Sequence, residues 1–163
     1  MTTCGKSCLT ALNIITILLV VTIGIVVVLV DLPVIKTQQV GIHTENAPGA
    51  IAPYSQAIKS DGLVFVAGQI GMTPAGVFEA ESAGDQTFQA LTNIQNILEE
   101  AGVSMKDVVK VTVMMTDIAE YDEINEVYGE FFEDPKPARS AFQVGALPKT
   151  EAKVEIEVIA TYK

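Results

Sequence analysis

An uncharged apolar run near the N-terminus sets the first constraint on how this chain can fold. Residues 9–30 read LTALNIITILLVVTIGIVVVLV, a stretch of 22 residues without a charged side chain. As a helix with a rise of about 1.5 Å per residue, the run would cross a hydrocarbon core of about 30 Å. We therefore expect a transmembrane helix over 9–30, preceded by a tail over 1–8, that anchors the protein in a membrane.

A cleavable signal peptide is the main alternative for the same run. The apolar region of a signal peptide is usually about 7 to 15 residues long and ends at a small-residue cleavage site. Here the run is longer and continues into Val30-Asp31-Leu32-Pro33, which has no Ala-x-Ala pattern. The length favours a single-pass anchor. Lys6 before the run favours a cytoplasmic N-terminus, with the rest of the chain on the far side.

The remainder of the chain is acidic and poor in metal ligands and thiols. Residues 31–163 keep nine basic and all twenty acidic residues, a formal charge of −11. Such a charge repels nucleic-acid phosphates, and no basic patch offsets it, so we expect no nucleic-acid partner. Cys4 and Cys8 both precede the apolar run and are either acylation sites or free thiols. His43 is the only histidine. Residues 31–163 therefore hold no disulfide, thiol nucleophile or metal site built from several histidines or cysteines.

Hydropathy patterns predict an α+β domain over 44–163, after a connector with a first strand over 31–43. Apolar residues recur at helical spacing in 85–101 and again from Tyr121 to Phe132, which predicts two helices. Asp117–Glu120, just before the second helix, is typical of a capping box. Further strands are expected at 57–59, 63–67, 108–115, 139–144 and 154–160. This order predicts a mixed sheet with two helices packed on one side.

Arg139 is the only arginine of the chain and begins an apolar strand. A guanidinium can hold a carboxylate or phosphate with two parallel hydrogen bonds, which an ammonium cannot. Alternation places Arg139, Ala141 and Gln143 on one face of their strand, and Glu155 with Glu157 on one face of the next. Glu155 is therefore the leading internal partner of Arg139. Two interpretations stay open: a salt bridge between them, or a shared pocket in which Arg139 binds a substrate carboxylate and Glu155 handles a proton or a water.

Six sequence blocks follow one another between Thr44 and Ala160: ENAPGAIAPYSQAI, VFVAGQIG, NILEEAGVSMKDVVKVTVMMTDI, YDEINEVYGEFF, PARSAFQVGALPK and VEIEVIA. Together they resemble the RidA/YjgF family of enamine/imine deaminases. The resemblance implies a chorismate-mutase-like fold and a homotrimer with pockets at the subunit interfaces. It also implies the hydrolysis of reactive 2-imino acids to 2-oxo acids and ammonia, a detoxifying reaction that needs no cofactor.

The resemblance also implies roles for single residues. Arg139 matches the arginine that holds the substrate carboxylate, and Glu155 matches the glutamate that positions and activates the attacking water. Tyr54 and Asn125 match a tyrosine and an asparagine of the pocket, and Gly68 matches the glycine whose backbone lies against the ligand. By pattern alone, these last three would be a packed loop aromatic, a solvated helix residue and a strand-end turn.

Two alanines depart from the family pattern. Ala67 and Ala141 stand where the family often has a serine or threonine and a cysteine, so at Ala141 only the backbone can contact a substrate. The segment from Leu147 to Glu155 is one residue longer than usual. These departures leave an alternative open, a trimeric module of the same fold that binds a small carboxylate without catalysis. A third interpretation is a trimeric scaffold that clusters the anchors.

Overall fold

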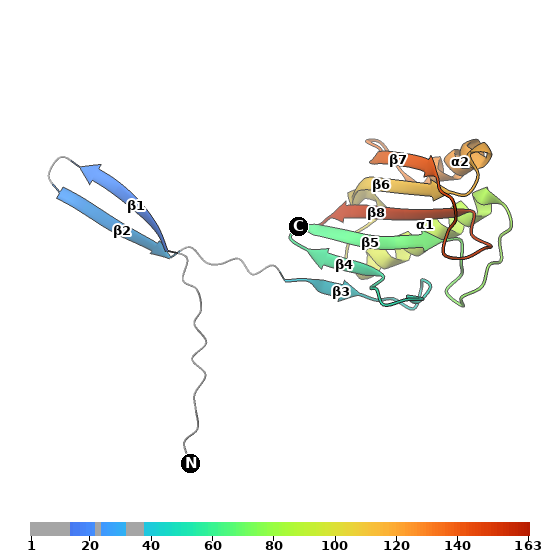
Figure 1. Ribbon diagram of the computed structural model, residues 1–163, viewed down its shortest axis with the longest axis horizontal. Coiled ribbons are helices and arrows are strands. Elements are labelled where there is room, and N and C mark those ends of the chain that lie inside the picture. Colours follow the sequence, from blue (N-terminus) through green and yellow to red (C-terminus); the bar gives the residue numbers. More distant parts are fainter. Residues whose placement is uncertain (1–13, 22–23, 32–37) are drawn as a thin grey trace, which may run out of the picture. The chain divides into compact units, whose positions relative to one another are not determined.

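The computed structural model describes residues 14–21, 24–31 and 38–163 of the chain. It divides into two compact units, Met1–Thr37 and Gln38–Lys163. In the first unit, β1 (Ile14–Val21) and β2 (Gly24–Asp31) pair antiparallel, from Ile14 opposite Asp31 to Val21 opposite Gly24 (Figure 1).

The helix expected over 9–30 is therefore wrong for the described residues of that range, which form two paired strands. The physical reason lies in the side chains. Isoleucine and valine dominate both segments, IITILLVV and GIVVVLVD, and β-branched residues lose rotamer freedom in a helix but fit a pleated strand. In the parts of the chain that the structure describes, no helix is both long and apolar enough to cross a membrane. The tail over 1–8, with Cys4 and Cys8, lies outside the described residues.

The second unit is built on one sheet of six strands in the order β3-β4-β5-β8-β6-β7. Only β6 and β7 run parallel, and every other neighbouring pair is antiparallel, so the sheet is mixed, as predicted. The strands are β3 (Val40–Ile42), β4 (Ala57–Ser60), β5 (Leu63–Ile70), β6 (Val108–Met115), β7 (Ala138–Gln143) and β8 (Val154–Thr161). Consequently β3 and β7 are the edges, and β8 is inserted between β5 and β6 (Figure 1).

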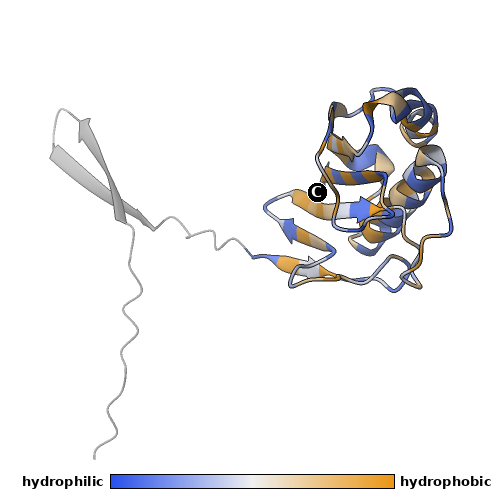
Figure 2. Ribbon diagram, turned by 45° about the vertical axis from the view of Figure 1, so that its right-hand side comes forward, coloured by the Kyte–Doolittle hydropathy of each residue, from blue (hydrophilic) through white to orange (hydrophobic). Residues whose placement is uncertain are grey.

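Two α-helices complete this unit, α1 (Ala83–Glu100) and α2 (Tyr121–Phe131). The face of α1 that packs on the sheet carries Leu91, Ile94 and Leu98, all fully buried in one core with Val111 and Ile156. Figure 2 shows hydrophilic residues interspersed with these hydrophobic ones along the helices and strands. The predicted α+β class, with two helices on a mixed sheet, is confirmed.

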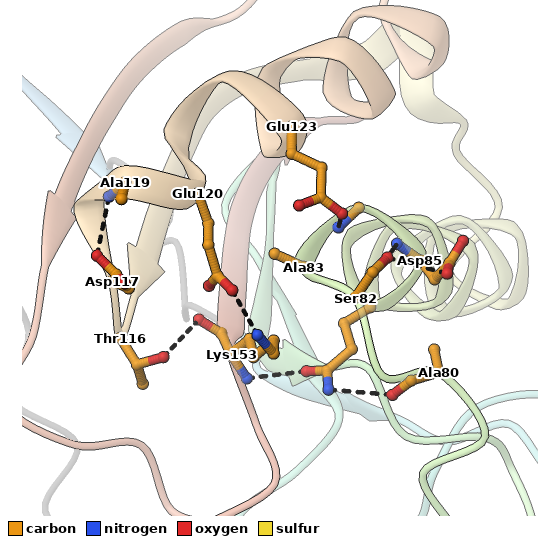
Figure 3. Close-up of polar contacts among 12 residues, drawn as sticks. Ala80, Ser82, Ala83, Asp85, Thr116, Asp117, Ala119, Glu120, Glu123 and Lys153 are labelled. Atoms are coloured by element: carbon orange, nitrogen blue, oxygen red, sulfur yellow. Dashed lines mark hydrogen bonds and ion pairs between the residues drawn. The ribbon is translucent and has the colours of Figure 1, made fainter.

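Side-chain caps begin α1 and the 3₁₀ turn that precedes α2. Ser82 accepts a hydrogen bond from the Asp85 amide at 3.0 Å and begins α1. Asp117 accepts one from the Ala119 amide at 2.9 Å and begins a 3₁₀ turn, η2 (Ile118–Glu120), which leads into α2. The second half of the expected capping box is not formed, because the Glu120 carboxylate pairs with the Lys153 ammonium instead (Figure 3).

Candidate functional site

The sheet register places the two main candidate residues on opposite faces. Arg139 in β7 pairs with Val111 in β6, which in turn pairs with Val158 in β8, and both valines are buried in the core. Arg139 therefore points to the face that the helices cover. Glu155 pairs with Met114 and alternates with the buried Val154 and Ile156. Its carboxylate consequently lies on the other face.

The two residues are also far apart along the sheet. They are separated by two strand spacings and three residues, which corresponds to about 14 Å between their Cα atoms. No carboxylate of the described residues lies within ion-pair distance of Arg139. The salt bridge considered from the sequence is therefore not formed, and a single chain does not bring Arg139 and Glu155 to one pocket.

The first group, which we call the arginine cluster, comprises Arg139, Tyr121, Tyr128 and Asn125. The Arg139 guanidinium carbon lies 4.5 Å from the centre of the Tyr128 ring and 5.7 Å from that of Tyr121. Its Nη2 donates a hydrogen bond to the Tyr121 hydroxyl at 3.1 Å. Two aromatic rings thus hold the guanidinium in place, while most of its five N–H donors remain available to an anion.

Helix α2 supplies the rest of the arginine cluster from one side. Tyr121, Asn125 and Tyr128 have i, i+4, i+7 spacing, so they follow one another along the helix surface. Burial raises the pKa of the Tyr128 hydroxyl, and the positive charge of Arg139 partly opposes that rise, so the phenol is neutral near pH 7. A hollow of about 400 Å³ adjoins Tyr121. Tyr121 therefore borders this hollow and also contacts the Arg139 guanidinium.

Ala141 belongs to the same strand as Arg139 but contributes differently. It pairs with Val113, which is fully buried, and its methyl group packs against the core. Its side chain therefore fills space on the helix-covered face. Because β7 is an edge strand, the backbone of this position remains the part that a ligand could reach.

The second group, which we call the glutamate cluster, comprises Glu155, Gly68 and Tyr54. A Cβ atom added at Gly68 would lie 1.9 Å from Glu155 Oε1 and 2.8 Å from its Cδ. Only glycine therefore allows the carboxylate to lie directly over the β5 backbone. The ladder between β5 and β8 shifts register between Val66 and Gln69, so Gly68 sits in a local irregularity of β5.

The Glu155 carboxyl is half-buried, and its environment favours the neutral form. Burial raises its pKa above the ordinary range, and the negative charge of Glu157 raises it further. No cation of the described residues lies within ion-pair distance to oppose this. A carboxyl with a raised pKa can exchange a proton nearer neutral pH, which is the property required of a general base that must also return the proton.

Tyr54 lies in the loop before β4 and is 46% exposed. Its hydroxyl accepts a hydrogen bond of 3.4 Å from the Ile51 amide. Two residues later, the carbonyl of Gln56 accepts from the Ala67 amide at 3.0 Å, which brings this loop beside the segment of β5 that contains Gly68. Tyr54 is thus on the β5 side of the sheet, with the glutamate cluster.

Sequence reasoning missed Tyr121, in the arginine cluster, and Gln56, which supports the loop that carries Tyr54. The apolar periodicity of its helix predicts a buried Tyr121, whereas this residue is 36% exposed and hydrogen-bonded to Arg139. Gln56 is 2% exposed, and its side-chain amide donates to the carbonyls of Thr44 and Pro48, which orders the loop that carries Tyr54. An isolated glutamine beside an apolar strand carries no periodic signal that would identify such a role.

Comparison with known proteins shows that the chain resembles a family profile, individual relatives in sequence and a solved structure in fold. The profile of a family described as Endoribonuclease L-PSP matches residues 44–162. The chain is 50% identical over 121 residues to Reactive Intermediate Deaminase A, chloroplastic, of Arabidopsis thaliana, covering 74% of this chain and 64% of that protein. It is 47% identical over 120 residues to 2-iminobutanoate/2-iminopropanoate deaminase of Bos taurus, covering 73% and 87% of the two chains. The crystal structure of Escherichia coli TdcF with bound serine superposes with a TM-score of 0.70 at 42% identity, covering 76% and 98%.

Proposed function

Given that the chain belongs to the RidA/YjgF family, we propose that it hydrolyses reactive 2-imino acids and their enamine tautomers to 2-oxo acids and ammonia. Imine deamination is the reaction for which several relatives are named. The observation that carries the proposal is the chemistry of the two clusters. One presents a guanidinium without a carboxylate partner among the described residues, and the other presents a half-buried carboxyl with a raised pKa.

The active site that we propose lies between two copies of the chain. Because the two clusters lie on opposite faces of one sheet, a small substrate cannot touch both within one chain. Members of this family are generally oligomeric. In a homotrimer with cyclic symmetry, every interface could join the arginine cluster of one copy to the glutamate cluster of the next, which gives three equivalent sites.

The reaction would proceed in two steps. Arg139 holds the substrate carboxylate with two hydrogen bonds and so fixes the imine carbon. A water oxygen bonds to that carbon while the C=N electron pair moves to nitrogen, and Glu155 takes the proton that the water loses. Glu155 then returns the proton to the nitrogen of the carbinolamine. The C–N bond breaks as the hydroxyl proton passes to the departing nitrogen, so the 2-oxo group forms and ammonia leaves.

The substrate class follows from the arginine cluster. A 2-imino acid carries its carboxylate on the carbon that is attacked, so one guanidinium both binds and orients it. A relative of known structure binds serine, which is likewise a small acid with nitrogen on the α carbon. Tyr54, Asn125 and the backbone at Gly68 would line the remainder of the pocket. The proposed chemistry uses no cofactor.

Hydrolysis of 2-iminobutanoate or 2-iminopropanoate, generated in situ by oxidation of the amino acid, tests this proposal. The full-length protein should accelerate formation of the 2-oxo acid. Arg139→Lys should lose most of that acceleration, because an ammonium cannot form the bidentate contact. Undiminished activity in Arg139→Lys and Arg139→Ala would contradict the role of Arg139. An inactive protein that binds 2-oxobutanoate through Arg139 would instead favour the carboxylate-binding module.

A further inference from the structure

A buried glutamine in α1 ties together two segments that are distant in sequence. Gln86 is 2% exposed, and its Nε2 donates hydrogen bonds to the carbonyls of Ala80 at 3.2 Å and Glu151 at 2.9 Å. Its Oε1 accepts a hydrogen bond of 2.8 Å from the Lys153 amide. A buried amide is unfavourable unless its polar atoms are hydrogen-bonded, and here both the oxygen and the nitrogen are bonded to backbone.

Gln86 also packs against the end of β5. A Cβ atom added at Gly71 would lie 2.5 Å from Gln86 Cβ and 2.7 Å from its Cα, so the β5 end and α1 are in direct contact. Ile70, the residue before Gly71, pairs with Glu155 across the ladder. Lys153, to which Gln86 is hydrogen-bonded, precedes Glu155 by two residues. Gln86 thus touches the backbone on both sides of the Glu155 position.

The ladder itself constrains Glu155 weakly at this point. Pairing between β5 and β8 is regular up to Val66 opposite Val158, then resumes at Gln69 opposite Ile156 after a register shift. Only that pair and Ile70 opposite Glu155 follow the irregularity. The position of Glu155 relative to the Gly68 backbone therefore depends on contacts at the strand ends.

We propose that Gln86 is a positioning residue for Glu155. It holds the end of β5 by packing and the start of β8 by a hydrogen bond, and so keeps the Glu155 carboxylate over Gly68. Gln86 does not touch the substrate. The inference rests on the proposed function for its catalytic consequence, whereas the placement of Glu155 can be measured without any reaction.

Lys153 provides a second connection from the same point. Its carbonyl accepts a hydrogen bond of 2.9 Å from the Thr116 amide. Its ammonium pairs with the Glu120 carboxylate (Figure 3). Glu120 directly precedes Tyr121, which holds Arg139. Substitution of Gln86 should therefore disturb the glutamate cluster, whereas substitution of the Lys153 side chain keeps both backbone hydrogen bonds, removes the pair with Glu120 and should disturb the arginine cluster.

Kinetics of full-length variants test the positioning role. Gln86→Met has a similar volume and removes all three hydrogen bonds. We expect its kcat for imine hydrolysis to fall about tenfold or more, because small misplacements of a catalytic group are costly. Its KM should stay within about twofold, because Arg139 binds the carboxylate. Lys153→Met keeps the backbone hydrogen bond to Gln86 and loses the Glu120 ion pair, so its KM should rise more than its kcat falls. Gln95→Met is the matched control, since Gln95 is exposed on the same helix and its side chain bonds only Glu99.

Titration of the Glu155 carboxyl by NMR gives a readout that does not require activity. In Gln86→Met the Glu155 pKa should move down toward the ordinary glutamate range as burial is lost, while Glu157, which shares its strand face, remains in place. If the wild-type protein does not hydrolyse imines but Gln86→Met still lowers the Glu155 pKa, the proposed function is overturned and the positioning role stands. Retention of both kcat and the Glu155 pKa in Gln86→Met would overturn the positioning role.

A conservative variant separates positioning from folding. Gln86→Glu keeps an acceptor for the Lys153 amide, so it should retain more kcat than Gln86→Met at equal folded fraction. The folded fraction of each variant is measured by thermal melting. A kcat loss that follows only the loss of folded protein, equally in both variants, would contradict the proposal.

Discussion

Arg139 and Glu155 lie on opposite faces of one sheet, two strands and three residues apart. Each belongs to its own cluster, the first with α2 and the second with the β5 backbone. If both act on one substrate, then each chain gives its arginine to one site and its glutamate to another. The two side chains of one site would thus come from two neighbouring chains.

Mixing of two inactive variants should restore activity. Arg139→Ala and Glu155→Gln chains each lack one half of every site, but a mixed trimer contains interfaces where an intact arginine meets an intact glutamate. Random assembly of equal amounts should restore about a quarter of the wild-type sites. The measurement is imine hydrolysis after co-refolding, with each variant alone as control. A mixture without activity would place both residues of a site in one chain.

Gly68→Ala should impair catalysis more than stability. The added methyl group would overlap the end of the Glu155 side chain, which can rotate away from it. We expect kcat to fall at least tenfold by loss of the general base, with little change in melting temperature. Gly49→Ala is the control, because a Cβ atom there has no neighbour within 4 Å. Full activity in Gly68→Ala would show that the carboxylate does not need the position it occupies over β5.

The raised pKa of Glu155 has consequences for both stability and rate. Because the folded-state pKa lies above the unfolded value, the folded state binds the proton more tightly, and stability falls as pH rises from the unfolded pKa through the folded pKa. Glu155→Gln should therefore melt at a higher temperature than the wild type near pH 7, with a smaller difference in acid. Activity should rise with pH as Glu155 ionises, with a midpoint above the ordinary glutamate range. Glu100→Gln, at an exposed position of α1, is the control, and an equal gain in that variant would contradict the assignment to Glu155.

Tyr121→Phe isolates the hydroxyl that Arg139 contacts. The substitution keeps the ring and removes a hydrogen bond of 3.1 Å, worth about 0.5 to 1.5 kcal/mol. We expect KM to rise about two- to tenfold as the guanidinium loses its alignment, while kcat changes less. Tyr162→Phe serves as control, because the Tyr162 ring lies instead under Lys59. An unchanged KM would mean that the rings alone align Arg139.

The location of the protein remains a prediction from the uncharged run over 9–30. If this run inserts into a membrane in spite of its pairing as strands, the full-length chain should stay in the pellet after alkaline carbonate extraction. A chain that begins at residue 38 should remain in the supernatant. Release of the full-length protein by carbonate would contradict membrane insertion.

Local patterns predicted the second unit well because its elements have clear periodicity. The strands, both helices and the α+β class follow from alternation and helical spacing. The insertion of β8 between β5 and β6 is a long-range pairing that no local pattern contains. Alternation could therefore assign Arg139 and Glu155 to faces of their own strands, but not relate those faces to each other.

The errors have similar origins. The run over 9–30 is long enough for a membrane helix, and it also has the β-branched composition of paired strands. The prediction of a helix rests on length alone. Glu120 fits a capping box by its spacing, yet a more distant cation, Lys153, competes for its carboxylate. In both cases an interaction outside the local pattern determines the structure: strand pairing in the first case and the Lys153–Glu120 ion pair in the second.

The contact between Gly68 and Glu155 has a consequence for how this chain can vary. Position 68 is restricted by the length of the side chain across the ladder and not by an unusual backbone angle of its own. A methyl group at 68 should therefore leave the carboxylate of residue 155 over the β5 backbone only when that residue is shortened, as in Gly68→Ala combined with Glu155→Asp. Substitutions at positions 68 and 155 should therefore occur together among related sequences.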